Sequence, residues 1–322
     1  MAGRDISKGG FMNRFGSCVI ALAASAVCAL IPASALAQNS GAPVRIVVTA
    51  EARKGSEAPQ IAQADVMVHE GHDRDQVTSW VPAQGENAAL ELVILLDDGS
   101  GMSLGTQLDE LKKFILAQPA STKIALAYMQ DGMAKMQQNL TSDHAAVANA
   151  VRLPMGIPGV NASPYFSLSD LVKRWPQSSA RREVLMITDG IDRYYGSGDP
   201  QDPYLSAAID DAQRAGILVY GIYTPGAGHF GHSYWQAYWG QIYLSHLAED
   251  AGGEAYYIGM NGPPVTFNPY LEDFERHLNN QYWLTFNPKP EKKSGWHSIK
   301  VSTETPNAEL VAPHKVYVNE AK

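Results

Sequence analysis

The chain has 322 residues, and its 25 Lys and Arg against 33 Asp and Glu give a formal net charge of −8 at pH 7. This acidic balance, without a basic stripe, argues against nucleic acid and anionic membranes as partners. Both cysteines, Cys18 and Cys28, lie within the first 37 residues, so zinc sites built on cysteine are excluded from the rest of the chain.

Residues 1–37 have the pattern of a secretory signal peptide. Three basic residues precede an apolar run at 18–31, and an Ala-x-Ala cleavage pattern ends at Ala37. The run is shorter than the roughly 20 apolar residues that a membrane-spanning helix needs, and no later segment is apolar enough to span a bilayer. We therefore expect cleavage after Ala37 and export to the periplasm or the extracellular space.

Residues 38–85 are expected to form an N-terminal β segment. A strand pattern at 44–49 is followed by two more, at 65–69 and 76–80, which flank Glu70-Gly71-His72-Asp73 as a hairpin turn. His69 to Asp73 also contain metal-ligand residue types. In a hairpin turn these side chains need not converge, so we interpret them as solvated turn residues.

Residues 86–280 change to alternating strands and helices, which predicts an α/β domain with a doubly wound, mostly parallel sheet. The expected strands are 91–97, 124–129, 133–138, the run that ends at Thr188, 217–223 and 254–258. The expected helices are 103–117, 143–152, 165–175, one that begins at Pro203, 233–250 and 269–280. Asp131-Gly132 predicts a tight hairpin turn, and Gly216 predicts the end of a helix.

Residues 281–322 are expected to form a C-terminal β segment. Strand patterns occur at 282–286, 296–301 and 316–318, with turn residues between them. These strands can pair with those of the N-terminal segment beside the α/β domain.

Two acidic turns follow the most apolar strands of the chain. Leu90–Leu96 leads into Asp97-Asp98-Gly99-Ser100, and Val184–Ile187 leads into Thr188-Asp189-Gly190. Strands this apolar are buried on both faces in parallel sheets. Ligands of such sheets collect beyond the carboxyl ends of the strands, and oxygen donors from two loops are what Mg²⁺ or Ca²⁺ needs.

These motifs, in this order, resemble those of von Willebrand factor type A (VWA) domains, and more narrowly those of secreted bacterial proteins that frame such a domain with β segments. The resemblance covers roughly residues 62–320. It rests on the two acidic turns and on three further stretches, Ala212–Tyr220, Leu247–Gly253 and Asn280-Gln281-Tyr282.

The resemblance implies a metal-ion-dependent adhesion site on the top edge of the sheet, often completed by a carboxylate from a partner protein. It assigns Asp98 and Ser100 as the first two ligands of Mg²⁺ or another divalent cation, and Asp189 as the ligand from the third loop. Asp97 is then interpreted as a carboxylate that faces the other side of the sheet.

Two positions depart from the family pattern. Met102 stands where a second Ser is expected, and a thioether is a poor ligand for a hard cation; Ser103 follows one place late. The Thr of the second loop is absent, which leaves Ser163 as the candidate there. The alternative to metal binding is that these side chains hydrogen-bond the loops and their backbone N–H groups.

Other residues are candidates for contact with a partner at the same edge. Asp192, Arg193 and Tyr194 follow the second acidic turn, and His229, Phe230 and His232 follow the strand 217–223. The spacing of Trp235, Tyr238 and Trp239 instead favours core packing. Gly226–Gly231 matches a dinucleotide-binding pattern, but no acid ends the following strand, so no nucleotide is expected.

Enzyme motifs such as His-Glu-x-x-His and Gly-x-Ser-x-Gly are missing from the sequence. We therefore expect an exported, non-enzymatic module that binds an unknown protein or other macromolecule through a divalent-metal site or a degenerate version of one. Two alternatives stay open: a Mg²⁺- or Mn²⁺-dependent hydrolase at the same acidic edge, and a structural domain whose metal site has decayed.

Overall fold

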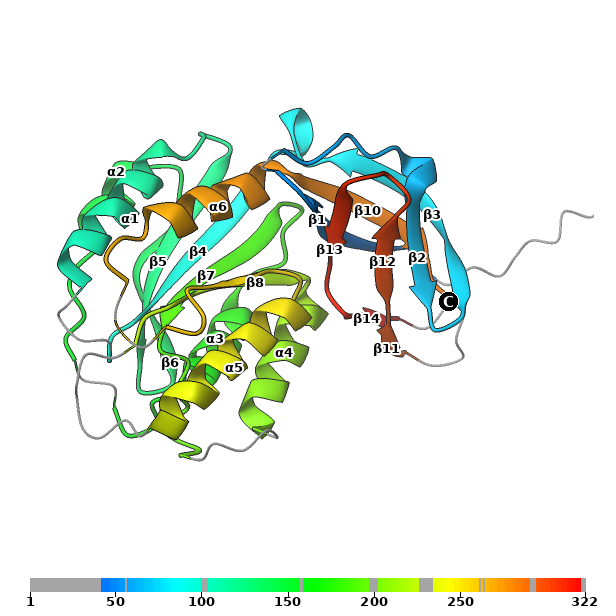
Figure 1. Ribbon diagram of the computed structural model, residues 1–322. Helices are drawn as coiled ribbons and strands as arrows, with labels where there is room; N and C mark the ends of the chain where they lie inside the picture. The colour runs from blue at the N-terminus through cyan, green and yellow to red at the C-terminus, as the bar shows by residue number, and fades with distance from the viewer. Residues whose placement is uncertain are drawn as a thin grey trace, which may run out of the picture. The chain divides into compact units, whose positions relative to one another are not determined.

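The computed structural model describes residues 42–55, 57–99, 104–156, 159–196, 202–225, 234–260, 262, 264–289 and 294–319 (Figure 1). The predicted signal peptide, Ser100, Ser103, His229, Phe230 and His232 lie outside the described residues. Among the described residues, no helix is long and apolar enough to cross a membrane.

The elements alternate between strands and helices in the middle of the chain and are strands at both ends. The strands are β1 Val44–Ala52, β2 Val66–Glu70, β3 Asp73–Pro82, β4 Leu90–Asp97, β5 Thr122–Gln130, β6 Met133–Thr141, β7 Arg181–Thr188, β8 Ile217–Tyr223, β9 Ala255–Tyr256, β10 Gln281–Asn287, β11 Gly295–Ser298, β12 Lys300–Thr303, β13 Ala308–Val311 and β14 Lys315–Val318. The helices are α1 Gly105–Ala117, α2 His144–Ala150, α3 Pro164–Arg174, α4 Pro203–Ala215, α5 Tyr234–Asp250 and α6 Asn268–Asn279, with short 3₁₀ turns at Gln63–Asp65 and Gly85–Asn87.

The central sheet has the strand order β6-β5-β4-β7-β8-β9. Its neighbouring strands from β5 to β9 pair in parallel, and only the edge strand β6 is antiparallel. The chain therefore extends the sheet from β4 first to one side and then to the other. This arrangement confirms the predicted α/β class, and the change of direction between β4 and β7 is where open α/β sheets place their ligand sites.

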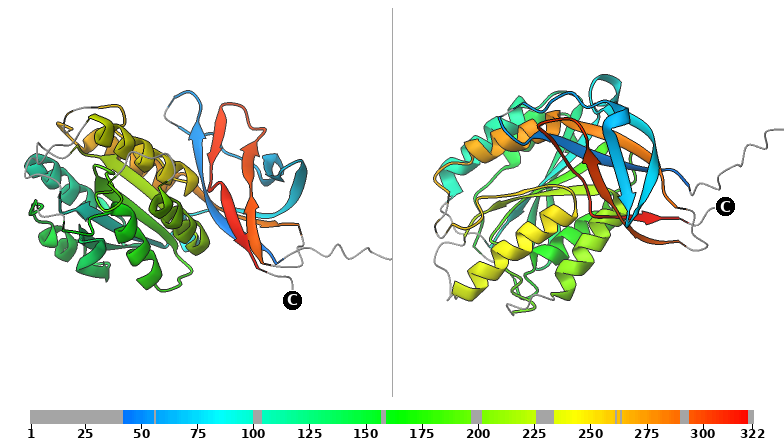
Figure 2. Two further views of the ribbon diagram at one scale, coloured as in Figure 1. Left: turned by 90° about the horizontal axis from the view of Figure 1, so that it is seen from below. Right: turned by 45° about the vertical axis from the view of Figure 1, so that its right-hand side comes forward.

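Helices cover both faces of this sheet, as Figures 1 and 2 show. Because side chains alternate along a strand, Leu92, Ile94 and Leu96 of β4 pack with α1, α2 and α6. Val93 and Leu95 of the same strand pack with α3, α4 and α5 on the other face. Alternate side chains of the apolar strand β4 therefore pack into two separate hydrophobic cores, one on each face of the sheet.

The terminal segments pair with one another in a second six-stranded sheet, in the order β12-β2-β3-β10-β1-β13. β10 lies between β1 and β3 and pairs antiparallel with both. Val48, Trp80, Leu284 and Phe286 are members of its buried core. The stacking of Trp80 on Tyr282, with ring centroids 4.3 Å apart, joins the two ends of the sequence.

Three expectations differ from the structure. The pattern at 296–301 is two strands, because β11 pairs with β14 whereas β12 pairs with β2. Strand β13 lies where only turn residues are expected between the strands. In α5, the first-turn side chains Trp235 and Tyr238 are exposed rather than packed in the core, and Trp239 is partly buried against the core.

Candidate functional site

Asp97 is the last residue of β4, and Asp98, which follows it, lies on the opposite face of the sheet. Asp97 follows Leu95 on the α3–α5 face, where its carboxylate accepts hydrogen bonds from Thr188 Oγ1 and the Gly99 backbone N–H, both at 2.8 Å. Burial, and next the charge of Asp189, raise the pKa of Asp97 to about 6. The carboxylate that faces the Thr-Asp-Gly turn is therefore Asp97.

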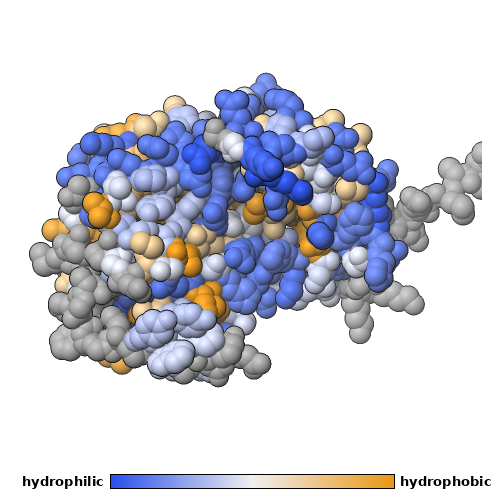
Figure 3. All heavy atoms as spheres, in the orientation of Figure 1, coloured by the Kyte–Doolittle hydropathy of each residue, from blue (hydrophilic) through white to orange (hydrophobic). Residues whose placement is uncertain are grey.

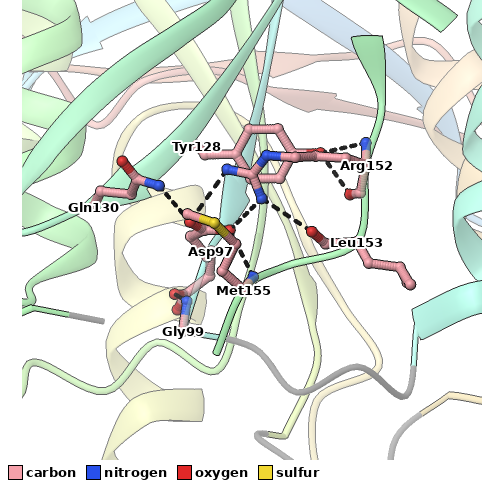
Figure 4. A network of polar contacts seen from close by, with 8 residues as sticks. Asp97, Gly99, Tyr128, Gln130, Arg152, Leu153 and Met155 are labelled. Carbon is pink, nitrogen blue, oxygen red and sulfur yellow. Dashed lines mark hydrogen bonds and ion pairs between the residues drawn. The ribbon is translucent and has the colours of Figure 1, made fainter. Parts of the chain in front are cut away.

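Asp98 lies on the other face, in contact with an arginine. Arg152 makes a two-pronged contact with its carboxylate, Nη1 to Oδ1 at 2.6 Å and Nη2 to Oδ2 at 3.2 Å. Gln130 Nε2 and the Met155 backbone N–H also donate to Asp98 (Figure 4). Burial alone would raise the pKa of Asp98, but these hydrogen bonds outweigh it and hold the pKa below its usual value.

Arg152 is itself fixed by Tyr128 of β5. The guanidinium carbon lies 3.8 Å from the centre of the tyrosine ring, a cation–π contact. The Tyr128 hydroxyl donates to the Arg152 carbonyl at 2.6 Å and accepts from the Arg152 backbone N–H at 2.8 Å. The arginine is thus built into the sheet edge rather than extended into solvent.

Asp189 forms an ion pair with a second arginine, Arg193. Arg193 Nη2 lies 2.5 Å from Asp189 Oδ2, and the Ile191 backbone N–H donates to Oδ1 at 3.0 Å. Burial disfavours the charged form of Arg193, but Asp189 and Asp97 outweigh it, so the pKa of Arg193 is raised. One guanidinium therefore balances the two buried carboxylates on this face.

Ser163 is the N-cap residue of α3. Its hydroxyl accepts from the Phe166 backbone N–H at 3.3 Å and donates to Asp192 Oδ2 at 2.8 Å. Asp192 also accepts from the backbone N–H groups of Tyr194 and Tyr195, both at 2.9 Å. Asp192 is buried and fixes the loop, whereas Tyr194 is half exposed.

A close backbone approach sets the position of the Thr-Asp-Gly turn. Gly190 has φ +67°, and a Cβ on it would lie 2.1 Å from the Gly240 carbonyl oxygen of α5. A Cβ on Gly240 would in turn lie 2.3 Å from the Asp189 carbonyl oxygen. Both glycines are therefore required for α5 to pack against the turn.

The family that the motifs resemble implies a divalent metal ion at this edge, held by Asp98, Ser100 and Asp189. Mg²⁺ needs oxygen lone pairs directed at the ion. Here both oxygens of Asp98 and both oxygens of Asp189 accept N–H groups, and each carboxylate has a guanidinium beside it. These two carboxylates, as they are arranged, do not fit a divalent ion.

Sequence reasoning missed Arg152 and Gln130. A signal for Arg152 is present, because it is the one charged residue between 151 and 163, a stretch that is otherwise mostly apolar residues, Gly and Pro. The sequence also predicts that Asp97 and Asp98 lie on different faces of the sheet, because Val93, Leu95 and Asp97 alternate with the other residues along β4.

Exposed apolar and aromatic side chains gather in the loops at the carboxyl ends of the strands. Ten of the fourteen large hydrophobic side chains that are exposed among the described residues lie there. They are Leu153, Met155, Val160, Tyr194, Tyr234, Trp235, Tyr238, Ile258, Met260 and Val265, which we call the carboxyl-edge patch. Figure 3 shows orange and near-white spheres on the lower left of this face, where these loops lie.

Neither a protein-family model nor a curated protein matches this sequence. Solved structures do match. An aerotolerance-related membrane protein from Bacteroides fragilis, 16% identical, aligns over 59% of this chain and 99% of its own, with a TM-score of 0.41. The vWF domain of the type V pili tip protein Mfa5 from Porphyromonas gingivalis, 12% identical, aligns over 59% and 94%, with a TM-score of 0.40.

The VWA domain of SpRpn10, 13% identical, aligns over 57% of this chain and 94% of its own, with a TM-score of 0.36. The structural neighbours of this chain thus include VWA domains, the family that its sequence motifs resemble.

Proposed function

We propose that this chain is an exported, non-enzymatic binding module of the VWA type, whose doubly wound sheet presents its carboxyl-edge loops to a protein partner without a metal ion. The observation that carries the proposal is the carboxyl-edge patch. Exposed apolar surface that is concentrated on one part of a soluble domain marks an interaction site, and this patch lies at the carboxyl ends of the strands, where the acidic turns also lie. Export rests on the signal-peptide pattern of residues 1–37.

The first turn of α5 provides the aromatic part of the patch. The side chains of Tyr234, Trp235 and Tyr238 are 72%, 65% and 44% exposed, and their rings contact one another. Tyrosine and tryptophan supply a large part of the binding energy at protein interfaces. A helix turn that holds three such rings outside the core suits a protein partner better than it suits solvent.

The charged residues at this edge of the sheet hold the exposed loops in place through hydrogen bonds. Asp192 holds the backbone N–H groups of Tyr194 and Tyr195, and the ring of Tyr194 contacts those of Phe166 and Tyr204. In this proposal Tyr194 contacts the partner, and Asp192 and Arg193 fix the loop that presents it. Recognition then depends on apolar contact area and not on a metal-bridged carboxylate.

Photo-crosslinking in the native host tests the proposal. A photoreactive phenylalanine analogue replaces Trp235 or Tyr194 in the patch, or Leu116 as the control, which is 55% exposed at the end of α1. We expect one partner to be crosslinked from both patch positions and not from Leu116. Binding of that purified partner should persist in EDTA and weaken at least tenfold in Trp235→Ala.

Three outcomes would overturn the proposal. Equal crosslinking from Leu116 would remove the role of the patch. Partner binding that requires a divalent ion and is lost in Asp98→Ala would restore the adhesion-site mechanism. Metal-dependent hydrolysis that Asp189→Ala abolishes would favour the hydrolase alternative instead.

A further inference from the structure

A second cluster of carboxylates lies away from the carboxyl-edge loops. Glu51 of β1, Glu254 immediately before β9 and His277 of α6 bring potential ligand atoms within 4.8 Å of one another. His277 Nε2 is 3.3 Å from Glu51 Oε1 and 3.5 Å from Glu254 Oε2. The three residues come from separate elements of the fold, and each contributes one potential ligand atom to the cluster.

These separations match the edges of a metal coordination tetrahedron. Zn²⁺ binds histidine nitrogen and carboxylate oxygen at about 2.0–2.2 Å, so two ligand atoms of a tetrahedral site lie roughly 3.3–3.6 Å apart by the geometry of those bonds. Both nitrogen-to-oxygen distances fall in this range. The three potential ligand atoms lie within 4.8 Å of one another, so two of the three edges match a tetrahedral site and the third is no longer than 4.8 Å.

The imidazole of His277 is oriented as a metal ligand. The residue is 7% exposed. Its Nδ1 lies 3.2 Å from the Tyr256 hydroxyl, which leaves Nε2 directed at the two glutamates. A hydrogen bond at the far nitrogen is the usual way that proteins fix the orientation of a ligating histidine.

The two glutamates have no guanidinium contact of the kind seen at Asp98. Within the described part of the chain, the ion pairs of Glu51 and Glu254 go to His277. Burial, and next the charge of Glu51, raise the pKa of Glu254 to about 7. The positive charge of Arg276 lowers the pKa of Glu254. The ion pair of Arg276, however, is with Asp273.

A cavity of about 440 Å³ gives access to the cluster. Glu51 and Glu254 line it, together with Lys300, Glu309 and His314. A ligand position of the metal that faces this cavity can hold water or a small anion. The site would thus be open on one side, as in zinc sites that have three protein ligands.

We propose that Glu51, Glu254 and His277 bind a divalent transition-metal ion, with Zn²⁺ as the ion that suits this donor set, in tetrahedral geometry with the fourth position toward the cavity. The ion joins β1, the segment before β9 and α6, so its binding stabilises the folded chain. This site is independent of the carboxyl-edge patch and of the partner proposed for it.

Titration calorimetry and thermal unfolding with ZnCl₂, on protein purified with a tag free of histidine, test this site. We expect one Zn²⁺ per chain and a melting temperature that rises with Zn²⁺ and falls with EDTA. Glu254→Gln should weaken Zn²⁺ binding at least tenfold, and because the Glu254 side chain is 47% exposed this variant should fold. Tyr256→Phe should weaken binding by roughly 10–100-fold through loss of the hydrogen bond to His277.

His314→Ala is the matched control, because His314 lines the same cavity but pairs with Asp250 at 2.7 Å. Its Zn²⁺ affinity should stay within twofold of the original. Co²⁺ should give the intense visible absorption of a tetrahedral site and lose it in Glu254→Gln. Absence of Zn²⁺ binding, or binding that survives Glu254→Gln and is lost in His314→Ala, would overturn the proposal.

Discussion

The two carboxylate clusters of this chain solve the same electrostatic problem in different ways. At the carboxyl ends of the strands, Asp98 and Asp189 each have an arginine within 2.6 Å. At the other cluster, Glu51 and Glu254 face a buried, neutral histidine. Asp98 and Asp189 are buried and need a positive charge or a proton, whereas the side chains of Glu51 and Glu254 are 32% and 47% exposed. The chain supplies the charge itself in the first cluster and leaves a place for a cation in the second.

The difference shows that an acidic motif alone does not determine whether a metal ion binds. The motif that resembles a family metal site has its charge balanced from within the chain, by Arg152 and Arg193. The second cluster has no sequence motif, because its members are far apart in the sequence. Glu51 and Glu254 are separated by 203 positions, and His277 lies further along the chain. Four predictions test this comparison.

The largest expected effect is that of removing Arg152. Arg152→Ala leaves the buried carboxylate of Asp98 without its cation, and loss of one partner of a buried ion pair costs about 3–5 kcal/mol. The control is Lys173→Ala, which removes the exposed ion pair to Asp211 at 3.0 Å and should cost about 1 kcal/mol or less. Urea unfolding at pH 7 measures both, and equal costs would contradict the role of Arg152.

Glu183 of β7 shows what burial does to a carboxylate whose arginine lies further away than those of Asp98 and Asp189. It is fully buried, its distance to Arg181 Nη1 is 3.9 Å, and burial raises its pKa from 4.5 to about 7. Because the folded state holds this proton more tightly, the stabilisation is present below pH 4.5 and is lost as the pH rises through 7.

We therefore expect wild type to lose about 3 kcal/mol relative to Glu183→Gln between pH 4.5 and pH 8, from about 1.4 kcal/mol per unit of pKa. Urea unfolding at the two pH values measures this difference. Glu86→Gln, at an exposed position, is the control that should show no such change. A parallel pH dependence of wild type and Glu183→Gln would mean that this carboxyl is not titrating in the folded state.

Within α5, exposed and buried aromatic residues should behave differently. Trp235→Ala should change the free energy of unfolding by no more than about 0.5 kcal/mol, as for other exposed positions. Tyr243→Ala, in the core of the same helix, should cost about 3–5 kcal/mol. Thermal and urea unfolding of the two variants compare them. A large cost for Trp235→Ala would show that this ring supports the fold and is not held for a partner.

The smallest expected effect is that of Mg²⁺ at the carboxyl edge. Because arginines occupy both carboxylates there, millimolar Mg²⁺ should shift the melting temperatures of wild type and Asp98→Asn equally. Thermal unfolding in Mg²⁺ and in EDTA gives the two shifts. A shift seen in wild type and absent from Asp98→Asn would mean that Mg²⁺ displaces Arg152 and that the family metal site is retained.

Much of the fold was accessible from the sequence because local patterns encode it. The apolar run of β4, the Asp131-Gly132 turn and the helix end at Gly216, which has φ +65°, follow from side-chain type and backbone preference. The strands at 296–303 were assigned less well. Their division between β11 and β12 depends on pairing with β14 and β2, which are distant in sequence.

The sequence by itself determined the α/β class, the order of the central elements and the edge at which the acidic turns lie, because periodicity and apolar runs are local properties. Only the tertiary structure decided which charges meet. Arg152 reaches Asp98 across 54 residues, and Trp235 stays exposed although its helix is mostly apolar. Glu51, Glu254 and His277 converge only when β1 and α6 are packed together, since ion-pair and ligand geometry depends on packing between distant segments.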